Sequence, residues 1–203
     1  NSLTGQTVEH AKKQYKQDRD PKEPLFQFKR CLVHFAVGNE AVEMTTRLQG
    51  HQTKFLPFNK DVVNPVHPNG HKSSYLWQDV LQPDTLLELI NSYLHVQRNT
   101  EKYYDKNKGL AEREYEVLIF PRFHQLDSVR KILGAVRNEG VGKSYLVQHS
   151  AGSGKSNSIA WLAHQLASLY QHKEDTERLF DSIIVVTDRR VLDKQLQDTI
   201  KQF

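Results

Sequence analysis

The stretch His149-Ser150-Ala151-Gly152-Ser153-Gly154-Lys155-Ser156 lies between two segments of different character. Residues 144–148 before it form a short, largely apolar segment, as in a buried strand. Residues 157–170 after it repeat apolar side chains at the three- and four-residue spacing of an amphipathic helix. A strand, a small-residue loop ending in Gly-Lys-Ser, and a helix together predict a phosphate-binding loop.

The residue types in this loop suit the binding of ATP with Mg²⁺. Gly152 and Gly154 permit backbone angles and a close approach that a Cβ would prevent. The N–H groups of the loop, from Ala151 through Ser153, and the start of the helix can then point at phosphate oxygens. Lys155 supplies a mobile positive charge for the phosphates, and the Ser156 hydroxyl is suited to ligate Mg²⁺.

Two features of the sequence could weaken this interpretation. His149 stands where the general Gly-x₄-Gly-Lys-[Ser/Thr] pattern begins with glycine, and an ordinary turn between strand and helix is the alternative. Residues 140–144, Gly-Val-Gly-Lys-Ser, also contain Gly-Lys-Ser. That second copy precedes the predicted strand, and no helix is expected to begin at Lys143. We therefore predict that residues 140–144 are only a turn.

Composition restricts the class of protein. Of 203 residues, 37% are hydrophobic and 26% charged, and the net charge is +4, which permits nucleic-acid binding without requiring it. No apolar run approaches the roughly 20 residues that cross a bilayer. The single cysteine, Cys31, excludes an internal disulfide and suits a reducing compartment, so we expect a cytoplasmic protein. The sequence begins at asparagine and ends within a helical pattern, which predicts a piece of a longer chain.

The first hundred residues predict a mixed structure. Residues 7–15 form a helical pattern with Thr7 as N-cap, and residues 31–37, 42–48 and 53–58 read as strands. Residues 59–74 are a proline-containing loop, in which His67 and His71 are more simply explained by solvated side chains than by a metal site. Residues 75–97 are helical, with a new helix beginning at Pro83.

The remaining residues predict the start of a nucleotide-binding domain. The charged segment 98–115 is the best domain boundary, and a helix is expected over residues 124–137. Residues 180–188 form a continuous β-branched run, typical of a parallel strand that is buried on both faces. A further helix is expected from Arg190 to Phe203. Residues 117–203 therefore predict an α/β fold with a parallel sheet.

Two motifs around the loop resemble those of superfamily 2 helicases. Residues 120–125, Phe-Pro-Arg-Phe-His-Gln, resemble the Q-motif, in which the glutamine amide reads the adenine edge, and this role would pass to Gln125. Residues 187–190, Thr187-Asp188-Arg189-Arg190, resemble motif Ia, which contacts the nucleic-acid backbone. Two arginines at a helix start oppose the helix dipole, which favours an anionic partner.

Longer stretches resemble the restriction subunit, which is both motor and nuclease, of type I restriction–modification enzymes. The resemblance covers nearly the whole chain, and it is carried by residues 147–164, 184–193, 3–8, 29–37 and 75–77. It implies an ATP- and Mg²⁺-dependent subunit that translocates double-stranded DNA and then cleaves it. It also implies modification and specificity subunits as partners. Residues 1–100 would be the rear of a PD-(D/E)xK nuclease domain with a helical end, 101–116 a charged linker, and 117–203 the front of a first RecA-like motor domain.

The chain departs from this family in three ways. The metal-binding acid and the Glu-x-Lys pair of the nuclease are absent from the sequence, as are the DEAD-like carboxylates of the motor. Gln14 would support the nuclease through a Gln-x-x-x-Tyr motif, but Tyr15 follows it directly and Asp18 occupies the fourth place. We therefore expect the 203 residues alone to be inactive. The alternatives are a superfamily 2 translocase without nuclease activity, and an interaction module in which the loop is vestigial.

Overall fold

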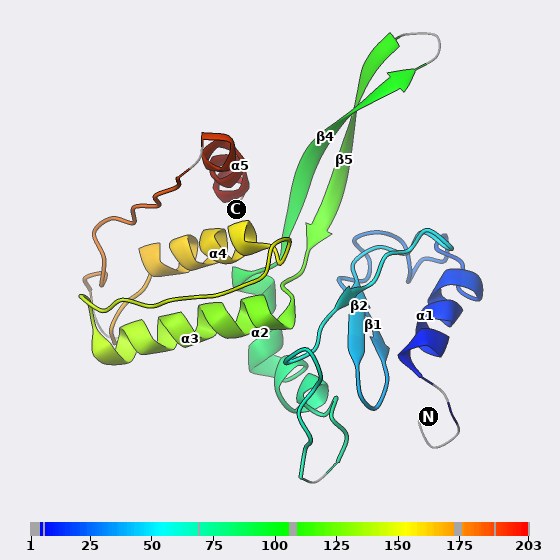
Figure 1. The fold of residues 1–203 in the computed structure, drawn as a ribbon, viewed down its shortest axis with the longest axis horizontal. Helices are drawn as coiled ribbons and strands as arrows, with labels where there is room; N and C mark the ends of the chain where they lie inside the picture. The colour runs from blue at the N-terminus through cyan, green and yellow to red at the C-terminus, as the bar shows by residue number, and fades with distance from the viewer. Residues whose placement is uncertain are drawn as a thin grey trace. The chain divides into compact units, whose positions relative to one another are not determined.

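A computed structural model describes residues 5, 7–68, 70–105, 109–172, 176–188 and 190–202. The chain divides into two compact units, Asn1–Arg122 and Phe123–Phe203 (Figure 1). Helices and strands are mixed in the first unit, whereas the described part of the second contains helices and extended coil. The mixed α/β class predicted from the sequence is confirmed. Within the described residues, no helix is both long and apolar enough to cross a membrane.

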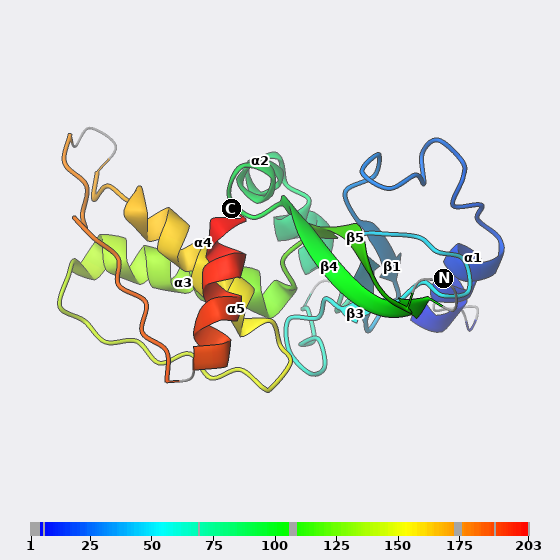
Figure 2. The same ribbon diagram turned by 90° about the horizontal axis from the view of Figure 1, so that it is seen from above.

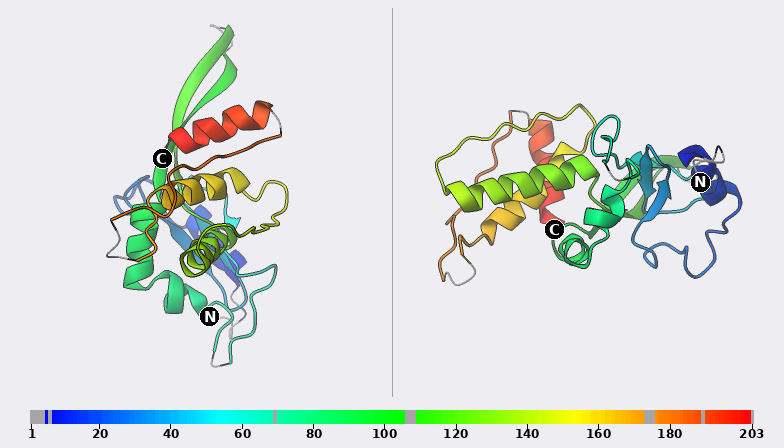
Figure 3. Two further views of the ribbon diagram at one scale, coloured as in Figure 1. Left: turned by 90° about the vertical axis from the view of Figure 1, so that its left-hand side faces the viewer. Right: turned by 90° about the horizontal axis from the view of Figure 1, so that it is seen from below.

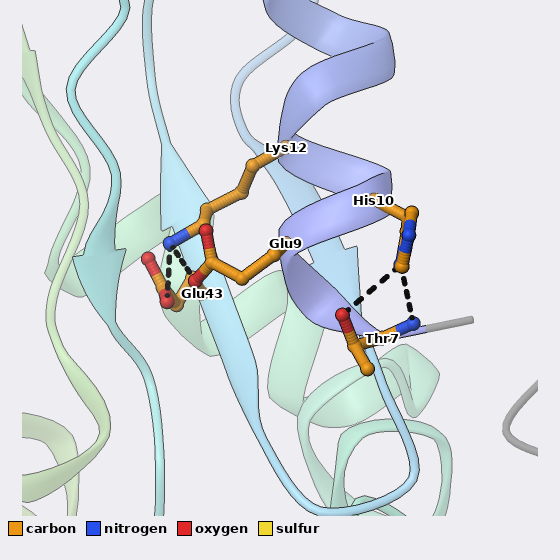
Figure 4. A network of polar contacts seen from close by, with 5 residues as sticks. All are labelled: Thr7, Glu9, His10, Lys12 and Glu43. Atoms are coloured by element: carbon orange, nitrogen blue, oxygen red, sulfur yellow. Dashed lines mark hydrogen bonds and ion pairs between the residues drawn. The ribbon is translucent and has the colours of Figure 1, made fainter. Parts of the chain in front are cut away.

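The first unit begins with helix α1, Val8–Gln17, which Thr7 caps as predicted (Figure 4). The Thr7 backbone N–H donates to His10 Nδ1 at 3.1 Å. Lys12 on the same helix reaches Glu9 at 2.6 Å and Glu43 at 2.8 Å. Burial by itself would lower the pKa of Lys12, but hydrogen bonds to Glu43 and Glu9 outweigh burial and raise it. The helix is thereby tied to the strand that carries Glu43.

Three short strands form an antiparallel sheet in the order β1-β2-β3: β1, His34–Val37; β2, Val42–Thr45; and β3, Leu56–Pro57. Phe35, Phe58, Tyr75 and Phe120 join their rings in one cluster, with centroids 5.1–6.5 Å apart. Such aromatic contacts add to the area that each ring buries. The core of this unit therefore connects the sheet to residues far along the chain.

The loop over residues 59–74 is irregular, as predicted, but a buried amide holds it. Asn64 is 2% exposed. Its Nδ2 donates to the Glu40 carbonyl at 2.9 Å and to Asn59 Oδ1 at 3.1 Å, and its Oδ1 accepts from the Lys60 N–H at 2.8 Å. A π-helical turn, Leu76–Val80, and helix α2, Pro83–Ser92, follow the loop.

A buried histidine makes the stability of the first unit depend on pH. His34 is 4% exposed, and the rings of Tyr15 and Phe26 lie 5.7 and 5.9 Å from its ring. Burial lowers the pKa of His34 below its usual value of 6.5. The unfolded chain therefore binds this proton more readily, so the stabilisation is complete above pH 6.5 and is lost as the pH falls below it. We expect the thermal midpoint of unfolding to decrease as the pH is lowered from about 7.5 to about 5.5.

Replacement of the imidazole tests this expectation. His34→Phe should reduce the dependence of the midpoint on pH, because phenylalanine keeps an aromatic ring in the cluster without a group that titrates. Burial also lowers the pKa of His95, so part of the dependence should remain. His51→Phe is the matched control, since His51 is exposed. Equal pH profiles for His34→Phe and the unmodified chain would show that another group is responsible.

Residues 101–105 and 109–116, predicted to belong to a charged linker, lie instead in the two strands of a long β-hairpin. Strand β4, His95–Asp105, pairs antiparallel with β5, Gly109–Ile119, from His95↔Ile119 to Asp105↔Gly109. Cross-strand charge pairs follow this register, with Arg113 reaching Glu101 at 2.8 Å and Lys102 reaching Glu112 at 3.4 Å. Figures 1 and 3 show the far end of the hairpin standing away from the β1-β2-β3 sheet.

The second unit contains helices α3, Phe123–Glu139; α4, Lys155–Ala167; and α5, Arg190–Lys201. Helix α4 packs against both α3 and α5, and α5 crosses it (Figure 2). The core of the unit consists mainly of apolar side chains from these helices: Phe123, Leu126, Val129, Leu133, Val136, Ala160, Trp161 and Leu196. The helices agree with the helical periodicity of the sequence.

The predicted parallel sheet is not confirmed. Residues 144–148 and 180–188 are extended coil, and every strand ladder within the described residues is antiparallel. The two segments do not pair with each other, and Leu146 is 93% exposed, Ile184 84% and Val186 86%. A parallel strand requires neighbours for its N–H and C=O groups and for both of its faces. Neither segment has such neighbours in the described part of the chain.

Candidate nucleotide-binding site

The loop predicted to bind phosphate lies directly before helix α4. Residues 150–153 make a turn, in which the Ser153 N–H donates to the Ser150 carbonyl at 3.4 Å. Gly154 is the N-cap of α4, with φ 83° and ψ 33°, and Gly152 has φ 73°. Both glycines thus adopt the left-handed conformation that other residues avoid. The sequence predicted this use of glycine correctly.

The second Gly-Lys-Ser copy behaves differently. Helix α3 ends at Glu139, Gly140 and Gly142 have positive φ, and no helix begins at Lys143. Lys143 is exposed and lies in coil. The prediction that no helix begins at Lys143 is therefore confirmed, although the strand expected after residues 140–144 is coil.

Lys155 folds back over its own loop. Its Nζ donates to the Ser150 carbonyl at 2.8 Å and to the His149 carbonyl at 3.3 Å. The ammonium group is thus held above the loop by carbonyl dipoles, while the residue as a whole remains exposed. This position allows the charge to exchange these carbonyls for the oxygens of a phosphate. Ser156, in the first turn of α4, is half-buried.

The side chain of Gln125 holds the end of the loop by a hydrogen bond to its backbone. Its side chain is buried, with 3% exposure, and its Nε2 donates to the Gly154 carbonyl at 2.8 Å. A Cβ added to Gly154 would lie 2.5 Å from that Nε2, so a side chain at this position cannot fit without displacing the amide. Gln125 was predicted to read an adenine edge. The structure shows instead that it contacts the loop, and the adenine role stays a prediction.

His124 and His149 form a contact that the sequence analysis missed. His124 Nε2 lies 3.1 Å from the Ser153 carbonyl, and its ring meets the His149 ring edge-on with centroids 4.8 Å apart. For this hydrogen bond the Nε2 of His124 must carry the proton. His149 was treated only as a departure from the glycine pattern. The available signal was a histidine at the start of the loop, His149, together with His124 directly before Gln125.

These features fit the phosphates of a nucleotide. The loop supplies backbone N–H groups at a helix start, a lysine ammonium already over the loop, and a glycine position that a side chain would block. The Oγ of Ser153 is buried without a hydrogen-bond partner in the part of the chain that the structure describes. No carboxylate contacts the loop among the described residues.

The other predicted site residues are not brought to the loop by any contact that the structure shows. Thr187 and Asp188 precede α5, Arg190 begins it, and Arg189 lies outside the described residues. Helix α5 is fixed on α4 through its far end, where His164 Nε2 lies 3.0 Å from the Ile200 carbonyl. Gln14 is exposed on α1 in the first unit.

Comparison with known proteins agrees with the loop's geometry. Residues 124–203 match the SWI2/SNF2 ATPase family. The chain is also 26% identical over 193 residues to a protein of Methanocaldococcus jannaschii named "Putative type I restriction enzyme MjaVIIIP endonuclease subunit". The aligned part is 87% of this chain but only 18% of that relative's length. No solved structure matches the chain significantly. The predicted resemblance, a helicase-like ATPase segment in a chain similar to a type I restriction endonuclease subunit, is confirmed.

Proposed function

We propose that this chain is part of the restriction subunit of a type I restriction–modification enzyme, and that it carries the ATP-binding loop of the DNA motor. The observation that supports this most directly is the loop at the start of α4, where Lys155 folds over left-handed glycines that Gln125 supports. The similarity to the archaeal relative extends over 193 residues, well beyond residues 124–203. That extent favours a restriction subunit over a translocase without a nuclease.

Each loop residue has a proposed task. The backbone N–H groups of Ala151 through Gly154 and the start of α4 hold phosphate oxygens. Lys155 leaves the carbonyls of its own loop and neutralises phosphate charge, and Ser156 holds Mg²⁺. ATP, when bound, supplies the phosphoanhydride bond whose hydrolysis drives movement along double-stranded DNA. Thr187, Asp188, Arg189 and Arg190 would contact the DNA backbone.

The proposal also assigns the domains and partners. Residues 1–100 would be the rear of a nuclease domain, with Gln14 in a supporting position, and residues 117–203 the front of the first motor domain. Residues 101–116, predicted as a charged linker, would lie between them along the chain. Modification and specificity subunits would complete the enzyme. The domain assignments rest on the resemblance, and the change of unit at Arg122/Phe123 lies near the proposed boundary.

The 203-residue chain is expected to bind ATP with Mg²⁺ but not to hydrolyse it. Hydrolysis requires an acidic group that positions Mg²⁺ and the attacking water. No carboxylate reaches the loop among the described residues. Titration with a fluorescent ATP analogue and a phosphate-release assay measure the two properties separately. Binding without turnover supports the proposal, absence of binding contradicts it, and ATPase or nuclease activity in the chain alone contradicts the predicted inactivity.

A further inference from the structure

The first unit contains a pocket, and none of its lining residues belongs to the nucleotide loop. It has a volume of about 230 Å³ and lies among Phe28, the end of β2 with the loop that follows, and the end of β5. More apolar than polar surface faces the pocket, and its lining includes two cations, one carboxylate and two aromatic rings: Arg47, Lys54, Glu116, Phe28 and Tyr115. Pockets that enclose a whole small molecule are usually about 300–1,000 Å³. This one is sized for part of a larger ligand.

Two cations of the pocket are available to a ligand. Arg47 and Lys54 are exposed, and neither forms an ion pair within the described part of the chain. The Arg47 guanidinium lies over the Phe28 ring, 4.8 Å from its centroid. That contact orients the planar group without neutralising its charge.

Buried hydroxyls fix the backbone that carries these cations. Thr45, 7% exposed, donates its Oγ1 to the Arg47 carbonyl at 3.1 Å and accepts from the Arg47 N–H at 3.4 Å. Thr53, 2% exposed, donates to the Gly50 carbonyl at 2.7 Å and accepts from the Gln49 N–H at 2.8 Å. These hydrogen bonds therefore fix the backbone positions from which the side chains of Arg47 and Lys54 extend.

The only carboxylate among the pocket's lining residues is already neutralised. Glu116 is paired with Lys29 and, at 3.6 Å, with Arg98. The hydrogen bond from Lys29 is the main reason that the pKa of Glu116 is lowered, with Arg98 adding to it, so the group stays ionised and paired near neutral pH. Lys29 and Arg98 thus pair with the one lining carboxylate, and the charges of the lining residues Arg47 and Lys54 are left without an ion pair among the described residues.

Lys29 holds its position at the cost of backbone strain. Its φ is 71°, the only positive φ outside glycine within the described residues. In the left-handed conformation the Cβ of a residue crowds the following carbonyl oxygen, so residues other than glycine rarely adopt it. Residues kept in such conformations cluster at functional sites. The strained residue also places its ammonium 5.6 Å from the Phe28 centroid, on the ring that Arg47 covers.

We infer that this pocket binds a backbone phosphate of double-stranded DNA, with Arg47 and Lys54 as the contacting cations. Cations interleaved with the aromatic rings of Phe28 and Tyr115 are typical of nucleic-acid-binding surfaces. The small volume suits one segment of a polymer better than a free nucleotide. The inference rests on the proposed function only in taking DNA as that polymer, because the pocket and the nucleotide loop belong to different units.

Salt-dependent DNA binding tests the inference. Anisotropy of a labelled duplex is measured with the chain between about 50 and 200 mM NaCl, for the unmodified protein and for Arg47→Ala/Lys54→Ala. Each lost phosphate contact reduces the slope of log K against log salt by about 0.9, so loss of the one phosphate held in the pocket should lower the slope by about 1 and weaken binding at low salt. Arg47→Gln/Lys54→Gln repeats the test if the alanine variant fails to fold.

Controls separate this pocket from general charge and from the nucleotide loop. Lys13→Ala/Lys22→Ala removes two exposed cations outside the pocket, and it should change the slope much less than the pocket variant. Inorganic phosphate and poly-glutamate are added at matched ionic strength in a Lys155→Ala background, and neither should displace the duplex. Binding of the ATP analogue should be equal in the unmodified chain and the pocket variant.

Three results would overturn the inference. The first is an equal loss of slope in the pocket variant and the Lys13/Lys22 control. The second is displacement of DNA by phosphate or poly-glutamate from chains with an intact pocket, which would identify a free anion or an acidic peptide as the ligand. The third is a chain that binds ATP but no duplex. In that case the nucleotide loop would still stand and the pocket proposal would fail.

Discussion

Replacing Lys155 by alanine is expected to weaken ATP binding by about 10- to 100-fold. The Lys155 ammonium lies over the loop, where it bonds to the carbonyls of Ser150 and His149. A hydrogen bond to a charged group contributes about 1.5–3 kcal/mol, and 1.4 kcal/mol is a tenfold change in affinity. Fluorescent ATP titration with Mg²⁺ measures the loss directly.

The second Gly-Lys-Ser copy provides the matched control. Lys143→Ala removes the same side chain from the same local sequence, but at a position in exposed coil where no helix begins. Its affinity for ATP should stay within about twofold of the unmodified chain, a difference of about 0.4 kcal/mol. If both substitutions lowered affinity equally, the effect would be one of net charge, and the assignment of the site to residues 149–156 would be wrong.

Gly154→Ala is expected to have the largest effect on folding of the second unit. The residue has φ 83°, which costs a residue with a Cβ roughly 1–2 kcal/mol. The new Cβ would also meet Gln125 Nε2 at 2.5 Å, so the amide must leave the Gly154 carbonyl. A buried group left without its partner costs about 1–3 kcal/mol more. Chemical denaturation should therefore show a loss of about 2–5 kcal/mol, together with weaker ATP binding.

Gly152→Ala separates the two contributions. Gly152 has φ 73°, but no atom lies within 4 Å of the Cβ that alanine would add. It should therefore show the cost of the backbone angle alone. Adding Gln125→Ala to Gly154→Ala removes the clash, so the double variant should lose about 1 kcal/mol less than the sum of the two single variants. Additive losses would mean that Gln125 does not confine Gly154.

The parts of the fold that local sequence determines were predicted well. Helices α1, α3 and α4 follow from apolar spacing within one segment, and the left-handed Gly154 follows from the Gly-Lys-Ser pattern. The β4-β5 hairpin was missed because its strands are rich in charge. The complementarity of Arg113 with Glu101 becomes visible only when the register is known.

Contacts between distant segments were beyond prediction from one sequence. Gln125 and Gly154 are 29 residues apart, and the resemblance to a helicase motif suggested only what the glutamine would do with a nucleotide. Residues 144–148 and 180–188 have the composition of buried strands. A strand forms only beside other strands, and their composition does not reveal whether those neighbours are in place.

If Gln125 reads the adenine edge, its bond to the Gly154 carbonyl would couple the selection of the base to the shape of the loop. An adenine that engaged the Gln125 amide would first have to release that bond, at a cost of about 0.5–1.5 kcal/mol. Only a base whose own donor and acceptor form hydrogen bonds with the Gln125 amide would compensate for this cost. Other bases would leave the bond between Gln125 and Gly154 intact. Discrimination among nucleotides would then depend on the energy needed to break the Gln125–Gly154 hydrogen bond as much as on the strength of the contacts with the base.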